Sequence, residues 1–199
     1  MRTKLKSRQV QVLQTKNKIY KVAIDLMEKK GFDNITVEDI SRKAGVSVGA
    51  FYHYFKSKKD ILFEIFHRFD KYFENEVHLT DGNTSEQIIL FFEHYARYTK
   101  ITGVNTAKKL YGTMDKLFLS TNRYMLSLLN NIIKTGQFNG DIIDNIPSEK
   151  ISEYLLIAAR GIAYDWCLHD GNYDIEASTV QYFERLIPIF ETKKRINMK

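Results

Sequence analysis

The sequence predicts an all-α fold with a small N-terminal domain and a larger C-terminal one. Only two prolines and ten glycines occur in 199 residues, and strand-type alternation of apolar and polar residues is scarce. A composition of 44% hydrophobic and 27% charged residues is that of a globular protein rather than a disordered one. We expect the first domain to cover residues 1–60 and the second to cover residues 61–199.

Positive charge is concentrated at the N-terminal end of the chain. The net charge is +6, but residues 1–60 hold 14 of the 30 Lys and Arg and six of the 24 Asp and Glu, a net +8, which leaves −2 for residues 61–199. A basic module suits binding to a phosphate backbone, because that affinity comes largely from counterion release. A solvated charged surface is the alternative that charge alone leaves open.

We expect a soluble, cytoplasmic protein with no membrane partner. Cys167 is the single cysteine, so no disulfide can form within the chain, and a reducing compartment suits it. The N-terminal stretch MRTKLKSRQVQVL lacks the apolar core of a signal peptide. No stretch approaches the 18 uninterrupted apolar residues of a membrane span.

The N-terminal domain is predicted to begin with a basic arm, residues 1–10, followed by a helix that ends at Gly31. The apolar face of this helix has the spacing i, i+3, i+4, i+7, i+8 and consists of Ile19, Val22, Ala23, Leu26 and Met27. Thr36 and Asp39 then form a capping box in its Asp variant and begin a second, short helix.

A tight turn and a third helix complete a helix-turn-helix over about residues 36–55. Gly45 suits a left-handed turn position, and Ser47 caps the third helix. Phe51 and Phe55 are spaced i, i+4 and should face the core. The residues left to point outward are Val48, Gly49, Tyr52, His53 and, in part, Tyr54.

The rest of the chain is predicted to be helical. Ser57 and Asp60 open a long fourth helix to about residue 79, and residues 79–85 form a linker. Further helices are expected near residues 84–101, 104–119, 122–138, 147–169 and 175–195. Pro188 should either kink the last one or end its regular hydrogen-bond ladder near Leu186.

At this point the residues carry a resemblance. The segment TVEDISRKAGVSVGAFYHYFKSKKDIL resembles the DNA-binding signature of the tetracycline-repressor (TetR) family of bacterial regulators, over roughly residues 15–65. A capped second helix, an AGVS turn, a pair of small residues, an aromatic core and a following lysine occur in the family's order. The resemblance implies a homodimeric DNA-binding protein with a helical effector domain.

Carried over by position, the resemblance gives each residue of the motif an expected role. Thr36 would hold a phosphate at the start of the second helix. The residues that would face the major groove are Ser47, Val48, Gly49 and Ala50, and those that would grip the DNA backbone are Tyr52, His53, Tyr54 and Lys58. Val48 departs from the family pattern, because an apolar side chain reads at most a thymine methyl group.

Two later helices each carry more apolar surface than one partner helix can cover. The helix near 147–169 has two stripes, one containing Leu155, Ala158 and Ile162 and the other Tyr154, Ile157, Gly161, Tyr164 and Leu168. A helix that is apolar on two sides needs two partners, one of which can be another subunit. The predicted dimer interface consists of Leu155, Ala158, Ala159, Ile162, Val180, Phe183, Ile187 and Phe190. Burial inside one monomer is the alternative.

The family places an effector pocket between the DNA-binding domain and this seam. The candidate lining residues are Phe92, Tyr95, Tyr98, Tyr111, Met114, Phe118, Tyr164 and Trp166, with His94 and Arg160 as polar anchors. Together they suggest an apolar effector with one polar or acidic end. The segment RGIAYDWCLHDGNYD resembles regions of family members that sense fatty acyl compounds. For each aromatic residue, simple core packing is the alternative.

No catalytic, metal or cofactor site is predicted. Asp165 and His169 share a helix face, but Cys167 lies about 200° away, so the three cannot converge on a metal. The sequence is therefore interpreted as a ligand-responsive transcriptional repressor and not an enzyme. The alternative is a DNA-organising or cell-division factor of the same fold without a small-molecule effector.

Overall fold

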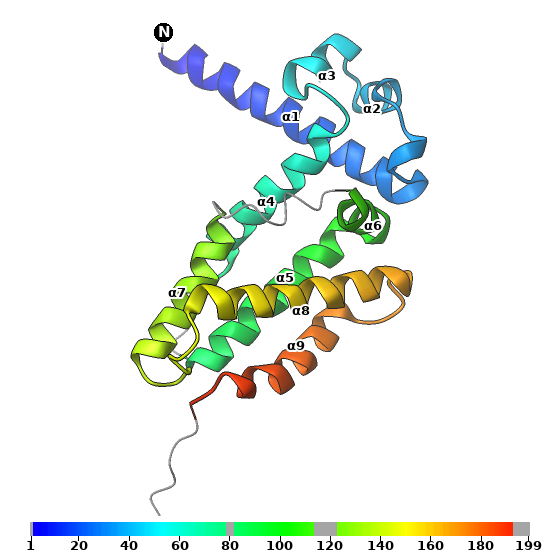
Figure 1. The fold of residues 1–199 in the computed structure, drawn as a ribbon. Coiled ribbons are helices and arrows are strands. Elements are labelled where there is room, and N and C mark those ends of the chain that lie inside the picture. Colours follow the sequence, from blue (N-terminus) through cyan, green and yellow to red (C-terminus); the bar gives the residue numbers. More distant parts are fainter. Residues whose placement is uncertain (1, 79–81, 114–122, 193–199) are drawn as a thin grey trace, which may run out of the picture.

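The computed structural model describes residues 2–78, 82–113 and 123–192, and within these ranges the chain is helical, as predicted (Figure 1). The helices are α1 (Arg2–Lys30), η1 (Phe32–Asn34), α2 (Val37–Ala44), α3 (Val48–Tyr54), α4 (Asp60–Glu76), α5 (Thr84–Thr102), α6 (Val104–Thr113), α7 (Tyr124–Phe138), α8 (Ser148–Leu168), α9 (Ile175–Leu186) and η3 (Ile187–Ile189). None of the helices in these ranges combines the length and the apolarity that crossing a membrane requires.

The helix-turn-helix is built by the predicted caps. The Thr36 hydroxyl accepts a hydrogen bond from the Asp39 amide, and the Asp39 carboxylate accepts one from the Thr36 amide, which completes the capping box. Gly45 ends α2 in the left-handed conformation, with φ of 66°. The Ser47 hydroxyl accepts from the Ala50 amide at 3.1 Å and begins α3.

Two predicted boundaries were wrong. Helix α1 begins at Arg2, so residues 2–10 form its first turns rather than an arm, because no glycine or proline interrupts residues 2–30. Helix α4 begins at Asp60, because the Asp60 carboxylate accepts from the Lys56 amide and the Ser57 hydroxyl and holds residues 57–59 in a turn. The end of α9 agrees with one of the two effects expected of Pro188, because the helix ends at Leu186 and the 3-10 helix η3 follows it.

Two hydrophobic cores divide the molecule. The first, which we call the head, joins buried side chains of α1, η1, α2, α3 and the first half of α4. The second, the body, joins the second half of α4 to α5, α7, α8 and α9. Helix α4 contributes Leu62 and Ile65 to the head and Phe69 and Phe73 to the body, and Figure 1 shows it running from one to the other.

Helix α6 is a second connection between head and body. The Glu28 carboxylate of α1 accepts hydrogen bonds from the Val104 and Asn105 amides, both at 3.0 Å, and so caps the N-terminus of α6. At the other side of α6, Lys108 forms an ion pair with Asp170, which follows α8. The head is therefore joined to the body both through the backbone of α4 and through side chains that hold α6.

Candidate nucleic-acid interface and effector cavity

Helix α3 separates its aromatic rings by direction, as predicted. Phe51 and Phe55 are buried, with 0% and 3% of their surfaces exposed, and their ring centroids lie 5.7 Å apart in the core of the head. Tyr52 is 51% exposed and His53 is also exposed. Tyr54 is half-buried and packs against the same core. The buried rings fix the helix so that the exposed ones are held outward.

The N-terminal end of α3 is open to solvent. Ser47, Val48 and Gly49 are exposed, and Ala50 is partly exposed. Because the Ser47 oxygen accepts from the Ala50 amide, its hydrogen remains for donation to a base or a phosphate. Thr36 is exposed too, but its hydroxyl donates to Asp39 at 2.9 Å, so its hydrogen is already used within the capping box.

Lys58 makes contacts inside the head in addition to the DNA-backbone role that the resemblance implies. Its ammonium group donates to the backbone carbonyls of Phe32 and Ile35, both at 2.7 Å, and lies 4.4 Å from the centre of the Phe32 ring. These carbonyls lie in the turn between α1 and α2, where acceptors lack helical partners. Two of the three ammonium hydrogens are thus committed inside the head, and only the third is left for a phosphate.

Other lysines of the head are free to meet a polyanion. Lys18, Lys56 and Lys59 are exposed and make no ion pair with any described residue. Lys56 and Lys59 directly follow α3, and Lys18 of α1 lies beside Gly45 in the turn before it. Sequence reasoning missed Lys18 as a site residue, because only the fold brings α1 next to that turn.

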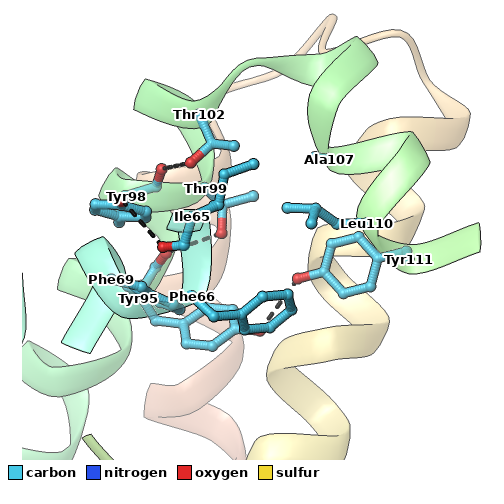
Figure 2. A pocket seen from close by; sticks show the side chains of 10 residues that line it. All are labelled: Ile65, Phe66, Phe69, Tyr95, Tyr98, Thr99, Thr102, Ala107, Leu110 and Tyr111. Atoms are coloured by element: carbon cyan, nitrogen blue, oxygen red, sulfur yellow. Dashed lines mark hydrogen bonds between the residues drawn. The ribbon is translucent and has the colours of Figure 1, made fainter. Parts of the chain in front are cut away.

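An apolar cavity lies between α4, α5 and α6, at the junction of head and body (Figure 2). Its volume is about 30 Å³, which is room for one or two water molecules. The residues that line it are Ile65, Phe66, Phe69, Tyr95, Tyr98, Thr99, Thr102, Ala107, Leu110 and Tyr111. Figure 2 shows the hydroxyls of Tyr95 and Tyr111 directed toward one another, and they lie 3.1 Å apart.

Three predicted pocket residues line this cavity, namely Tyr95, Tyr98 and Tyr111, and the others in the described ranges do not. Phe92 is fully buried and stacks on Phe183 at 3.9 Å, so it belongs to the body core. The indole of Trp166 donates to the Tyr173 carbonyl and closes the turn after α8.

The remaining predicted pocket residues lie elsewhere. Tyr164 is 51% exposed on the outer face of α8. His94 bonds the Tyr72 hydroxyl at 2.8 Å, and its partial burial there lowers its pKa. Met114 and Phe118 lie outside the described residues.

Charged groups act on the polar end of the cavity. Burial raises the pKa of the Tyr95 and Tyr111 hydroxyls, and the positive charge of Arg160 offsets part of this rise for both. Arg160 is partly buried and makes no ion pair with any described residue. It therefore stays a candidate anchor for a polar or acidic group, although it is not among the residues that line the cavity.

Most of the predicted dimer residues are buried within the monomer. Leu155, Ala159, Phe183, Ile187 and Phe190 are buried in the body core, with at most 8% of their surfaces exposed. Ala158, Ile162 and Val180 are partly exposed. The stripe of α8 that points outward is the second one, and its large exposed residues are Tyr154, Ile157, Tyr164 and Leu168.

This outward stripe continues onto the neighbouring elements. Tyr182 of α9 and Ile189 of η3 are 49% and 66% exposed. We call this surface the α8–α9 face, defined by Tyr154, Ile157, Tyr164, Leu168, Tyr182 and Ile189. A groove of about 430 Å³ crosses it at Gly161, where an added Cβ would meet no atom within 4 Å.

The Asp165–His169 segment does not bring Asp165, His169 and Cys167 together. His169 pairs with Asp165 on the exposed helix surface at 3.4 Å, as expected for two residues spaced i, i+4. Cys167 is buried on the opposite side, and this burial raises its pKa to about 11, which keeps the thiol protonated. Among the described residues, no three His, Cys, Asp or Glu side chains gather closely enough to hold a metal ion.

Comparison with known proteins identifies the head. Residues 19–65 match the family model described as "Bacterial regulatory proteins, tetR family". Over 149 residues the chain is 28% identical to the transposon Tn10 TetC protein of Escherichia coli, an alignment that covers 72% of each protein.

Solved structures share the whole fold. The transcriptional regulator FadR of Bacillus subtilis, in complex with stearoyl-CoA, superposes with a TM-score of 0.63 and 20% identity over 85% of this chain and 96% of that one. A regulator from Saccharomonospora viridis, in complex with choline, superposes with a TM-score of 0.64 and 18% identity over 91% of this chain and 99% of that one. The capped helix-turn-helix and the family match over it lead to one conclusion: residues 19–65 form a DNA-binding domain of the tetR family, and the chain as a whole shares the fold of these two solved regulators.

Proposed function

We propose that this regulator is a repressor that binds a palindromic operator as a homodimer and is released by a small, largely apolar effector. The observation that carries the DNA-binding part is α3, which is anchored by Phe51 and Phe55 and presents its N-terminal residues and Tyr52 to solvent. Such a helix fits the major groove, with small residues near base edges and the hydroxyl near a phosphate.

The dimer follows from the α8–α9 face. Six large apolar side chains exposed on one face of a monomer mark an interaction surface. A second copy of the chain is the occupant we propose, since paired heads at a fixed spacing are what a two-fold symmetric operator requires. The notch at Gly161 allows the helices of two subunits to approach closely.

The effector site is the cavity between α4, α5 and α6. In this structure it is too small for any effector larger than water, so an effector would have to enlarge it. An effector that binds only an enlarged cavity shifts the population toward a state with α4 and α6 displaced, and both helices hold the head. The stearoyl-CoA in the similar FadR structure supports a fatty acyl-type effector.

The DNA-binding proposal is tested by selecting duplexes from a random pool with the full-length protein. The enriched sequence should have two-fold symmetry, and affinity for it should fall steeply between about 50 and about 200 mM salt. Tyr52→Phe, which removes only a hydroxyl, should weaken binding about tenfold. Tyr124→Phe makes the same change on α7 and should leave affinity unchanged. Affinity that does not respond to salt would refute the proposal.

The small cavity favours one second candidate. A body filled by its own aromatic side chains suits a DNA-organising or cell-division factor that has no small-molecule effector. The two candidates differ in thermal denaturation against a panel of amphiphiles. A repressor of the proposed kind gains stability with at least one of them, whereas the factor gains none.

A further inference from the structure

Arg123, just before α7, is a buried cation whose hydrogen-bonding capacity is only partly used. Its side chain is 9% exposed, and its Nε donates to the Asp70 carboxylate of α4 at 3.2 Å. Its Nη2 is buried and has no hydrogen-bond partner among the described residues. A guanidinium stays charged at any physiological pH, and a buried charged donor without an acceptor is costly. A structural ion pair alone would use the fork of the guanidinium more fully.

Arg123 is not among the residues that line the cavity, but it packs against two rings that are. The guanidinium carbon is 5.1 Å from the centre of the Phe66 ring and 5.6 Å from that of Phe69, and both rings line the cavity. The charge of Arg123 also acts on the Tyr95 hydroxyl at the polar end. Arg123 therefore lies next to two lining residues and acts electrostatically on a third, so its positive charge is close to the cavity.

We infer that the effector is an amphiphile with an anionic head group, which binds Arg123, and an apolar tail, which enters between Phe66, Phe69 and Leu110. This inference rests on the proposed function, because it takes the cavity as the effector site. Sequence reasoning named only Arg160 as a cationic anchor, and Arg160 adds a second positive charge near the same hydroxyls. A ligand with a cationic head would be repelled by both arginines.

The same arginine gives the effector a route to the head. Asp70 accepts from Arg123 and, at 3.5 Å, from the Met125 amide, so it ties α4 to the start of α7. An anionic head group at Arg123 competes with the Asp70 carboxylate for one guanidinium. Binding therefore loosens α4 from the body, and the first half of α4 is part of the head core.

The charge preference is tested with three probes that share a twelve-carbon tail: dodecanoate, dodecanol and dodecyltrimethylammonium. Calorimetric titration of the full-length protein below micelle-forming concentrations should show dodecanoate binding at least about tenfold tighter than either of the others. Arg123→Met should reduce dodecanoate to the affinity of dodecanol. Arg42→Met, which changes an exposed arginine of the head, is the matched control and should preserve the preference.

A second variant guards against misfolding, since Arg123→Met leaves Asp70 without its cation. Asp70→Asn removes the competing carboxylate and should tighten dodecanoate binding several-fold, a gain that loss of structure cannot produce. If dodecanoate fails to bind, binds no tighter than dodecanol, or is not strengthened by Asp70→Asn, the inference is overturned.

A second measurement tests the proposed function independently of the anionic site. Duplex binding is measured with and without each probe in the same samples. Dodecanoate binding that depends on Arg123 but leaves the duplex bound supports the anionic site and refutes release by effector. Release by the neutral or cationic probe alone supports an effector-controlled repressor and refutes the anionic site.

Discussion

The Lys58 ammonium ties three parts of the head together. It reaches from the turn before α4 to two carbonyls between α1 and α2 and covers the face of the Phe32 ring. The side chains of Phe32 and Ile35 are themselves buried in the core of the head. Lys58 therefore holds in place both the backbone of this segment and the ring of Phe32, which covers the core. It thereby fixes the position of the segment that leads into α2.

Replacing Lys58 by Met should destabilise the head. The change keeps the length of the side chain but leaves two partly buried carbonyls without their donor, which costs about 1–3 kcal/mol. Lys59→Met changes the exposed neighbouring lysine and should cost less than about 0.5 kcal/mol. Urea unfolding measures both. Equal unfolding midpoints for the two variants would show that Lys58 has no structural role.

Local residue roles could be predicted from the sequence, whereas roles set by distant contacts could not. Caps and ring directions in α2 and α3 depend on neighbours within four residues, so Thr36, Ser47 and Phe51 were placed correctly. Lys58 bonds carbonyls 23 and 26 residues away, and Arg123 pairs with a carboxylate 53 residues away. No periodicity or motif marks either contact.

At the scale of elements, the N-terminus of α6 depends on a carboxylate from α1. Glu28 accepts from three successive amides, those of Val104, Asn105 and Thr106, and faces the positive end of the helix dipole. Gly103 leaves the space for it, since an added Cβ would lie 2.5 Å from the Glu28 carboxylate. The contact joins the head to the helix that lines the cavity.

Gly103→Ala should therefore displace Glu28 and uncap α6. Gly140→Ala is the matched control, because both glycines have positive φ, 90° and 77°, but an added Cβ at Gly140 meets no atom within 4 Å. Both variants place an alanine at a positive φ and so introduce similar backbone strain. Gly103→Ala should lower the free energy of unfolding by about 1–2 kcal/mol more than Gly140→Ala, which is the contribution of a helix cap. In a Glu28→Ala background this difference should vanish. If it persists in urea unfolding of the double variant, the carboxylate is not the cause.

Helix positions were more predictable than helix partners. The apolar periodicity located α5, α7 and α8, and Pro188 located the end of α9, because these signals are contained within each element. The two stripes of α8 are both apolar, so their spacing could not tell which faces the body. Packing against α5, α7 and α9 decides it, and that packing depends on the whole fold. The interface residues were drawn from the inner stripe for this reason.

At the scale of the molecule, the cavity is placed where it can control the head. Its walls come from α4, α5 and α6. Helix α4 enters the head core directly, and α6 holds α1 through Glu28 and η1 through the ion pair of Lys109 with Asp33. On the proposed function, an effector that enlarges the cavity moves α4 and α6 apart, and both helices hold the same head. The effector can shift the equilibrium between the closed and the open state only by the factor by which it binds the open state more tightly.

Assembly through the α8–α9 face gives the last prediction. In a two-fold interface each substitution occurs twice, so Ile157→Glu places two carboxylates against apolar surface and against one another. We expect the dimer to weaken about a hundredfold or more. Ile101→Glu makes the same change at a 65% exposed residue of α5, away from this face, and should leave assembly unaffected.

Sedimentation at micromolar concentration distinguishes the outcomes. The parent chain and Ile101→Glu should sediment as dimers and Ile157→Glu as a monomer with unchanged helix content. Because an operator with two half-sites binds a dimer through two heads, the monomeric variant should also lose most of its affinity for the full palindrome while binding a single half-site as the parent does. A parent chain that sediments as a monomer would remove the α8–α9 face as the interface and, with it, the fixed spacing of the heads.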